Sequence, residues 1–310
     1  MAVLIIRPGC QWSMAKPQLP SFPMNPPPEP SGAMHHARPE LILRAGHAEK
    51  NYWRDLWRFR ELFFFLAWRD ILVRYKQTAI GIVWALIRPF LTMLVFTFVF
   101  SRIARLPAES GAPYPIMVFA AMLPWQFFAT ALTESSNSLV NNSNLISKVY
   151  FPRLIVPSGS VITSFVDFLI TFGLLLGIMA WYRYPPDWHL LTLPLFILLA
   201  FGIAMSAGIW FCALTVRYRD MRYVVPFIAQ FGIYISPVGF SSTEVPERLR
   251  LIYSLNPMVG VIDGFRWAVL GGRTALYWPG IGATVVWIVI LGFTGIRYFR
   301  QTEKSFADVI

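Results

Sequence analysis

Long apolar segments alternate with short polar ones along most of this chain. Six of the apolar segments come near the roughly 20 residues that a helix needs to cross a ~30 Å hydrocarbon layer. They lie at about 81–101, 115–136, 156–182, 190–215, 223–240 and 278–298. The fifth is the shortest, and Pro226, Gly232, Pro237 and Gly239 interrupt it. The pattern predicts an all-α integral membrane protein with six transmembrane helices.

A mixed segment precedes the first span, and residues 51–77 read NYWRDLWRFRELFFFLAWRDILVRYKQ. Its apolar residues recur at spacings of three and four, with charged residues between them. The apolar positions are Trp53, Leu56, Phe59, Phe63 and Leu66, and the charged ones are Arg54, Arg58 and Glu61. This spacing predicts an amphipathic helix in the membrane interface, with basic side chains reaching the lipid headgroups. An ordinary helix of a soluble domain is the alternative.

The segment between the last two predicted spans holds one apolar patch, from Met258 to Leu270, which contains Asp263 and Arg266. A helix of about 13 residues reaches only ~20 Å. The patch is therefore predicted to be re-entrant or interfacial rather than spanning. At the other end of the chain, residues 1–45 are rich in proline and predict a disordered cytoplasmic tail. Residues 46–80 then form the interfacial helix with its lead-in, and residues 81–310 the six-span domain.

Composition agrees with a membrane protein, because 56% of the residues are hydrophobic and 14% are charged, against about 25% in soluble domains. The net charge of +11 fits the excess of Lys and Arg in cytoplasmic loops, and their distribution predicts that both termini are cytoplasmic. No basic run or RNA-reading motif is present, so nucleic acid is not an expected partner.

Catalytic motifs are absent from the sequence, which contains no GxSxG, HExxH or GxxxxGK[ST] pattern. Its histidines show no zinc-like spacing within a span, and it has only two cysteines. The chain is therefore not expected to be an enzyme or to bind a metal or cofactor. If ATP drives its activity, another polypeptide must bind the nucleotide. The ionisable residues at membrane depth are Arg88, Glu134 and Asp167, for which structural pairing is favoured over a transport-ion role.

Aromatic residues are abundant in the first, second and fifth spans. Their ordinary structural role would be to face lipid or to form belts at the membrane interface. Rings that line a channel would instead let sugars stack and slide. The candidates for such a wall are Trp84, Phe90, Phe96, Trp125, Phe127, Phe231 and Tyr234.

Residues 141–153, NNSNLISKVYFPR, form a compact polar segment between the second and third spans. Asn and Ser favour caps and turns, and Leu145, Ile146 and Val149 give a short amphipathic helix. Pro152 starts the turn into the next span. A solvated loop is one interpretation, and a helix that docks into a cytoplasmic partner is the other.

Four stretches, residues 66–100, 145–153, 216–240 and 253–272, together resemble a known family. They are similar to the ABC-2-type permease, the membrane subunit of polysaccharide-export ABC transporters for O-antigen, capsule and teichoic acid. The resemblance covers roughly residues 50–310 and leaves the Pro-rich tail without a counterpart. It also departs at Arg88, where family members often have a neutral polar residue before the proline.

The resemblance implies six-span subunits that form a homodimer in the inner membrane of a bacterium. Two copies of a separate cytoplasmic ATPase subunit would bind the ATP and Mg. The ATPase-docking helix would comprise Asn142, Asn144, Leu145, Ile146, Lys148, Val149, Tyr150, Phe151, Pro152 and Arg153. The interfacial helix would lie at about Tyr52 to Trp68, and re-entrant helices around Pro246 to Gly272.

The implied substrate is a glycan linked to an undecaprenyl-type lipid, threaded through an aromatic-lined channel at the dimer interface. Basic residues of the interfacial helix are candidates to attract the carrier pyrophosphate, or equally to contact anionic membrane lipid. They are Arg54, Arg58, Arg69, Arg74 and Lys76. Three alternatives stay open: a drug or antibiotic exporter of the same architecture, a membrane-embedded acyl- or glycosyltransferase, and a secondary carrier.

Overall fold

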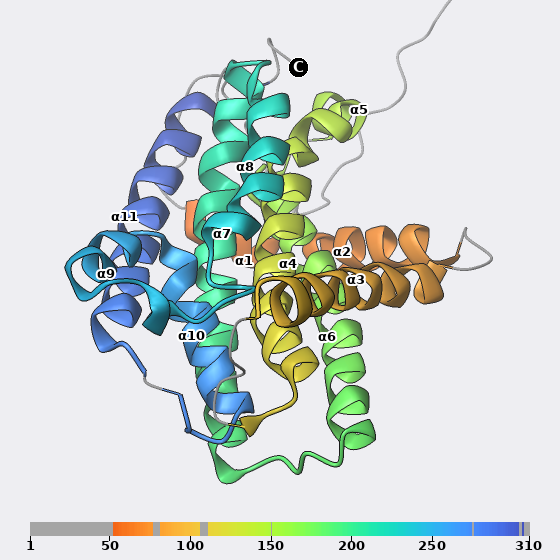
Figure 1. Ribbon diagram of the computed structural model, residues 1–310. Coiled ribbons are helices and arrows are strands. Elements are labelled where there is room, and N and C mark those ends of the chain that lie inside the picture. Colours follow the sequence, from red (N-terminus) through yellow and green to blue (C-terminus); the bar gives the residue numbers. More distant parts are fainter. Residues whose placement is uncertain are drawn as a thin grey trace, which may run out of the picture. The chain divides into compact units, whose positions relative to one another are not determined.

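The computed structural model describes residues 52–76, 81–105, 111–149, 151–274, 276–303 and 306. The predicted tail of residues 1–45 and the lead-in to residue 51 lie outside the described residues. Within the described ranges every regular element is a helix (Figure 1). The longer elements are α2 Arg60–Lys76, α3 Gly81–Thr97, α4 Tyr114–Asn141, α6 Ile155–Trp181, α7 Leu193–Arg217, α8 Met221–Ile235, α10 Pro257–Val269 and α11 Trp278–Thr302. The shorter ones are α1 Tyr52–Arg58, α5 Ser143–Lys148, α9 Glu247–Tyr253, a π-helical turn at Phe98–Ile103, and 3-10 turns at Trp188–Thr192 and Ser242–Glu244.

Five helical stretches among the described residues are long and apolar enough to cross a membrane. They are Val83–Ile103, Tyr114–Asn141, Ile155–Trp181, Trp188–Arg217 and Trp278–Thr302. Each coincides within a few residues with a span expected from the sequence. The chain is therefore an all-helical membrane protein with five long candidate spans and several shorter helices.

The predicted fifth span, 223–240, is only partly helical. α8 ends at Ile235, and its 15 residues extend about 22 Å. Ser236 is extended, with φ −88° and ψ 153°. The residue before a proline avoids the helical region, so Pro237 explains why the helix stops there. The expected six-span topology is thus not confirmed by helix length.

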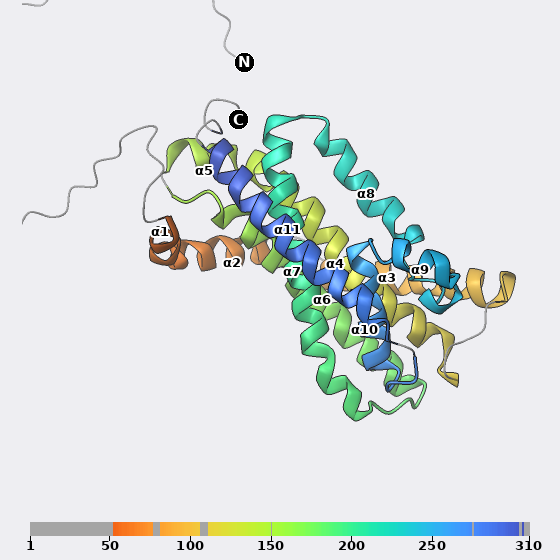
Figure 2. The ribbon, with the colours of Figure 1, turned by 90° about the vertical axis from the view of Figure 1, so that its left-hand side faces the viewer.

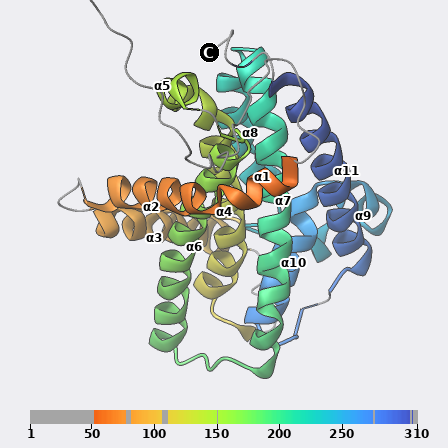
Figure 3. The same ribbon diagram turned by 180° about the vertical axis from the view of Figure 1, so that it is seen from behind.

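α4 is the centre of the bundle and packs against α6, α7, α8 and α10 (Figures 1 and 2). In its most apolar window 78% of the residues are buried, against 17% in the windows of α3 and α11. The outer helices therefore leave most of their apolar surface for lipid or a partner. α2 and α3 lie level in all three ribbon views, across the direction of α4, α6 and α7 (Figure 3).

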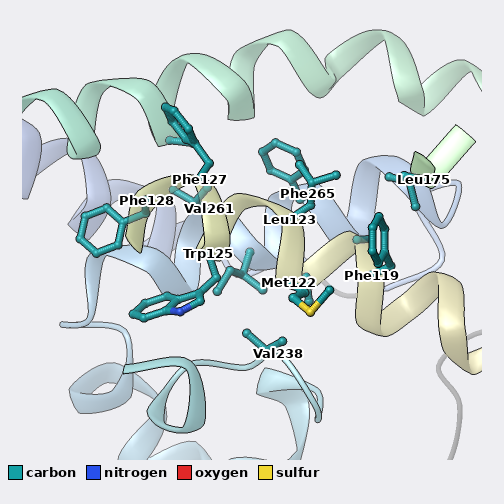
Figure 4. Close-up of a cluster of buried hydrophobic side chains, with 14 of the residues drawn as sticks. Phe119, Met122, Leu123, Trp125, Phe127, Phe128, Leu175, Val238, Val261 and Phe265 are labelled. Atoms are coloured by element: carbon teal, nitrogen blue, oxygen red, sulfur yellow. The ribbon is translucent and has the colours of Figure 1, made fainter. Parts of the chain in front are cut away.

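The main core surrounds α4 and combines large aromatic and aliphatic side chains (Figure 4). Phe127 contacts three rings of α6 and α7, with centroid distances of 5.7 Å to Phe165, 5.5 Å to Phe168 and 6.4 Å to Phe201. A second hydrophobic cluster, which we call the C-terminal cluster, lies near α5 and the end of α11. Its buried members are Leu66, Leu139, Ile146, Phe151, Leu154, Ile155, Val156, Ile209, Cys212, Ala213, Val216, Phe299 and Phe306.

The patch expected not to span forms α10, which is too short to cross and is almost wholly buried. Asn256 caps its start, since its Oδ1 accepts a hydrogen bond from Met258 N at 3.0 Å. Arg266, only 1% exposed, donates to the carbonyl of Pro237 at 2.7 Å and to that of Phe240 at 3.1 Å. Arg266 thereby supplies donors to the non-helical backbone that follows α8.

Candidate functional site

The loop that connects α4 to α6 contains the predicted docking segment, and α5 projects from the bundle at its upper end in Figure 1. Asn142 joins this loop to two helices. Its Nδ2 donates to Ser138 O of α4 at 2.9 Å, and its Oδ1 accepts from Arg69 Nη2 of α2 at 2.9 Å. The start of α5 is therefore fixed to both α4 and α2.

The predicted docking residues divide into a buried and an exposed set. Ile146 is 6% exposed and Phe151 4%, and both belong to the C-terminal cluster, with Leu145 packed beside them. Pro152 is also buried, and Arg153 contacts Glu303 beyond α11. Asn144, Lys148 and Val149 are exposed. Tyr150 lies outside the described residues. The buried residues anchor the loop in the C-terminal cluster, and the exposed residues are available to a partner.

A polar cleft of about 360 Å³ lies between α2, α4 and the first turns of α6. Arg74 of α2 donates to Glu134 of α4 at 2.8 Å and forms an ion pair with Asp167 of α6. Tyr75 also donates to Asp167. Burial, followed by the contact with Asp167, raises the pKa of the Tyr75 phenol well above its ordinary range. The cluster ties the interfacial helix to two bundle helices, and it agrees with the structural pairing expected for Glu134 and Asp167. Arg88, for which pairing was also expected, is exposed on α3 and forms no ion pair within the described ranges.

The five basic residues of the predicted headgroup site have different surroundings. Arg69 pairs with Asp70 at 2.7 Å, and Arg74 is paired as described above. The cleft is lined by the guanidinium groups of Arg69 and Arg74 and by the carboxylates of Asp70 and Glu134. Asp167 pairs with Arg74 from outside the lining, so the cleft carries no surplus positive charge. Arg54, Arg58 and Lys76 are exposed, and no ion pair involves them within the described ranges.

α1 and α2 have apolar residues on two faces rather than one. Leu56, Phe59 and Phe63 pack against the C-terminal cluster. Trp53, Trp57, Phe64, Phe65 and Trp68 are exposed large hydrophobic residues. Trp53, expected on the same face as Leu56, therefore belongs to the outward face. Such an outward row of aromatic rings suits the level of the lipid headgroups.

The candidate channel aromatics also divide by exposure. Trp84, Phe90, Phe231 and Tyr234 are exposed, and Tyr234 is the most exposed of them at 65%. On α8, Phe227 and Phe231 lie 4.3 Å apart between ring centroids, and Tyr234 stacks on Phe96 of α3 at 6.2 Å. Phe96, also a candidate, is only 8% exposed and belongs to the main core, so Tyr234 covers it. The outer surfaces of α3 and α8 therefore carry Trp84 and Phe90 on α3, and Phe231 and Tyr234 on α8.

Trp125 and Phe127 point to opposite sides of α4 and are both buried (Figure 4). Trp125 packs under α8, where a Cβ on Gly232 would approach its ring to 2.4 Å. Phe127 is enclosed by aromatic side chains of α6 and α7. Neither ring lines an open surface of the single chain.

The sequence did not indicate Glu303, the partner of Arg153. It assigned other roles to Asn142, which bridges α4 and α2, and to Arg74, which is the centre of the ion pairs. The available signal was the presence of polar and ionisable residues on or next to helices that otherwise pack through apolar faces. Across the described ranges, no three His, Cys, Asp or Glu residues form a group able to hold a metal ion.

Comparison with known proteins assigns residues 61–270 to the family model of the ABC-2 type transporter. The O-antigen export system permease protein RfbA of Myxococcus xanthus is 26% identical over 259 residues, which cover 83% of this chain and 98% of RfbA. A Klebsiella pneumoniae RfbA is 26% identical over 78% of this chain and 92% of its own length. The polysialic acid transport protein KpsM of Escherichia coli is 22% identical over 76% of this chain and 92% of KpsM.

Proposed function

This chain belongs to the ABC-2 type transporter family, and on that premise we propose that it exports a lipid-linked polysaccharide across the cytoplasmic membrane of a bacterium. The resemblance read from the sequence is thereby confirmed. Members of this family are non-catalytic membrane subunits, and a partner ATPase hydrolyses the ATP. The observation that carries the proposal is the similarity to RfbA, which extends over nearly the whole of that permease.

The ATPase docks on α5 and the residues that follow it. The exposed positions Asn144, Lys148 and Val149 provide a polar and apolar contact surface. Buried Ile146 and Phe151 give that surface a firm base, because side chains in a close-packed cluster transmit displacement instead of absorbing it. Two copies of the ATPase would serve two copies of this chain.

The homodimer forms through the outer faces of α3 and α8. Both faces carry exposed aromatic residues, and α3 is among the least buried of the long helices. Arg88 on α3 and Gln230 on α8 are exposed among these apolar side chains. An exposed surface dominated by aromatic and aliphatic side chains is typical of an interface or a lipid contact. Trp84, Phe90, Phe231 and Tyr234 would line a path between the two copies on which sugar rings stack, whereas Trp125 and Phe127 would support α4 from inside.

The carrier headgroup is recruited by Arg54, Arg58 and Lys76 rather than by Arg69 and Arg74. A diphosphate is attracted by surplus positive charge, and the cleft beside Arg74 carries none. The exposed residues would also contact anionic membrane lipid, which attracts basic segments by about 1 kcal/mol per residue.

The topology proposed is six membrane-crossing segments with both termini in the cytoplasm. For α3 to be the first crossing, it must turn from its level position beside α2 toward the direction of α4, α6 and α7 (Figure 3). α8 would be the fifth crossing, completed by the turn that Arg266 holds. This arrangement puts α5 on the cytoplasmic side and α10 on the outer side.

The first test is co-purification of the tagged chain from its native cells in mild detergent. We expect an ATPase with a Walker motif in equal amount, and we expect it to be lost in Lys148→Glu/Val149→Asp. Arg248→Glu, an exposed charge reversal on α9, is the matched control and should retain the ATPase. Absence of any ATPase from the wild-type preparation would favour the carrier or transferase alternatives.

A second readout separates polysaccharide export from drug export. Cells depleted of the chain should accumulate lipid-linked glycan on the inner side of the membrane. An ATPase that co-purifies without such accumulation would identify an exporter of another substrate class.

A further inference from the structure

The end of α11 meets the loop that follows α5. The backbone N of Arg153 donates to Glu303 Oε1 at 2.9 Å, and Arg153 Nη1 donates to the Glu303 backbone carbonyl. One residue of the loop is therefore held by both the side chain and the main chain of Glu303.

Two aromatic contacts reinforce this junction. Phe306, 1% exposed, packs edge-on against Phe299 with ring centroids 5.3 Å apart, and the Arg153 guanidinium lies 5.9 Å from the Phe306 ring. Arg300 lies over the ring of Tyr52 at 4.9 Å and so joins α1 to the same helix end.

The opposite end of α11 is fixed to α10. Thr284 Oγ1 donates to Pro257 O at 2.7 Å. A Cβ on Gly260 would lie 2.5 Å from the Gly280 carbonyl oxygen, so the two backbones are in direct contact. α11 has 25 helical residues, with one attachment in its first turns and the other just past its end, and it extends from the α5 end of the bundle toward α10 (Figure 2).

We propose that Glu303 is a positioning residue that fixes the base of the docking loop to α11, so that α11 carries movement of α5 to α10. The loop, α11 and α10 then form one continuous series of contacts from the ATPase side to the opposite side. The family match ends at residue 270 and assigns no part to Glu303. The direction of the movement, from the ATPase to α10, rests on the proposed function, but the mechanical link does not.

The test of the link uses the full chain alone in lipid nanodiscs and measures amide hydrogen exchange by mass spectrometry. Glu303→Ala should speed exchange in residues 143–156 and in residues 257–269. Glu303→Gln keeps an oxygen acceptor for the Arg153 N–H and should resemble the wild type. Gln301→Ala, an exposed change on the last turn of α11, is the matched control and should also resemble it.

Unchanged exchange in residues 143–156 of Glu303→Ala would overturn the positioning role. Faster exchange confined to residues 143–156 would support that role and overturn transmission to α10. These results do not depend on an ATPase, so they stand apart from a failure of the proposed function.

The second arm uses the permease–ATPase complex and measures glycan exported per ATP hydrolysed. Glu303→Ala should retain the ATPase but lower this ratio by roughly two- to thirtyfold, the range found for residues along coupling networks. Glu303→Gln should restore it. A wild-type ratio in Glu303→Ala would refute the coupling role, and absence of an ATPase from the wild-type complex would refute the proposed function.

Discussion

Replacing Arg266 by alanine should separate the turn after α8 from α10. Arg266 is 1% exposed and donates to the carbonyls of Pro237 and Phe240. Hydrogen bonds from a charged donor contribute about 1.5–3 kcal/mol each. Asp263 lies one turn earlier on α10, and its Oδ2 has no hydrogen-bond partner among the described side chains and backbone. Removing the nearby positive charge from such a buried carboxylate adds to the loss, so we expect about 3–5 kcal/mol in total.

The assay is the free energy of unfolding in mixed detergent micelles, followed by tryptophan fluorescence. Arg266→Lys keeps the charge but lacks the planar fork of donors, so it should lose about 1–3 kcal/mol. Arg248→Ala, an exposed arginine on α9, is the control and should change stability by less than about 0.5 kcal/mol. The double change Asp263→Asn/Arg266→Ala should recover part of the loss if the buried carboxylate contributes to it.

An Arg266→Ala protein within about 0.5 kcal/mol of the wild type would refute this reasoning. It would mean that water satisfies the carbonyls of the turn. In that case α10 would not be needed to stabilise the non-helical conformation that Pro237 starts after α8.

Three further substitutions test separate contacts. Arg74→Gln should lower the free energy of unfolding by about 1–2 kcal/mol, a moderate loss because the carboxylate partners of Arg74 are partly exposed. It should also speed amide hydrogen exchange in α2, and unchanged exchange there would contradict the ion-pair role. Gly260→Ala should lower the free energy of unfolding by about 1–3 kcal/mol, because the added Cβ would meet the Gly280 backbone, which cannot move away. Gly282→Ala, with open space around it, should leave stability unchanged or raise it. Equal unfolding midpoints for the two variants would show that α10 and α11 are not in close contact. Burial raises the pKa of the Glu303 carboxyl, so the native state binds its proton more tightly than the unfolded state does. The free energy of unfolding should therefore increase as pH falls toward the ordinary glutamate range. Glu303→Gln should lack this part of the increase, and parallel profiles of unfolding free energy against pH for the two proteins would argue against it.

Long helices were the most predictable part of the fold. Five expected spans coincide with long apolar helices, because twenty apolar residues in succession leave few alternatives in a membrane. The fifth span was overextended since its apolar run continues past Pro237, while the helix ends before it. Hydropathy reports where a chain prefers lipid, but backbone geometry decides where the helix stops.

Side-chain environments were less predictable than helices. Ile146 and Lys148 lie two positions apart in one predicted docking helix, yet one is buried and the other exposed. Trp125 and Phe127 were grouped as channel candidates, although both pack inside the bundle. The partners of Arg74 lie far away along the chain, on α4 and α6. Helical periodicity predicts on which side of its helix a residue lies, but not which residue of another helix it contacts there.

The C-terminal cluster has a consequence for the biosynthesis of the protein. It joins Leu66 of α2 to Phe306, which follows α11. At translation rates of roughly 5–20 residues per second, the earlier half waits for tens of seconds before the later half leaves the ribosome. During that time Ile146 and Phe151 lack the surface that covers them in the finished fold. Chains that stop before residue 299 would therefore keep apolar groups exposed beside α5, where chaperones and proteases distinguish incomplete copies from complete ones.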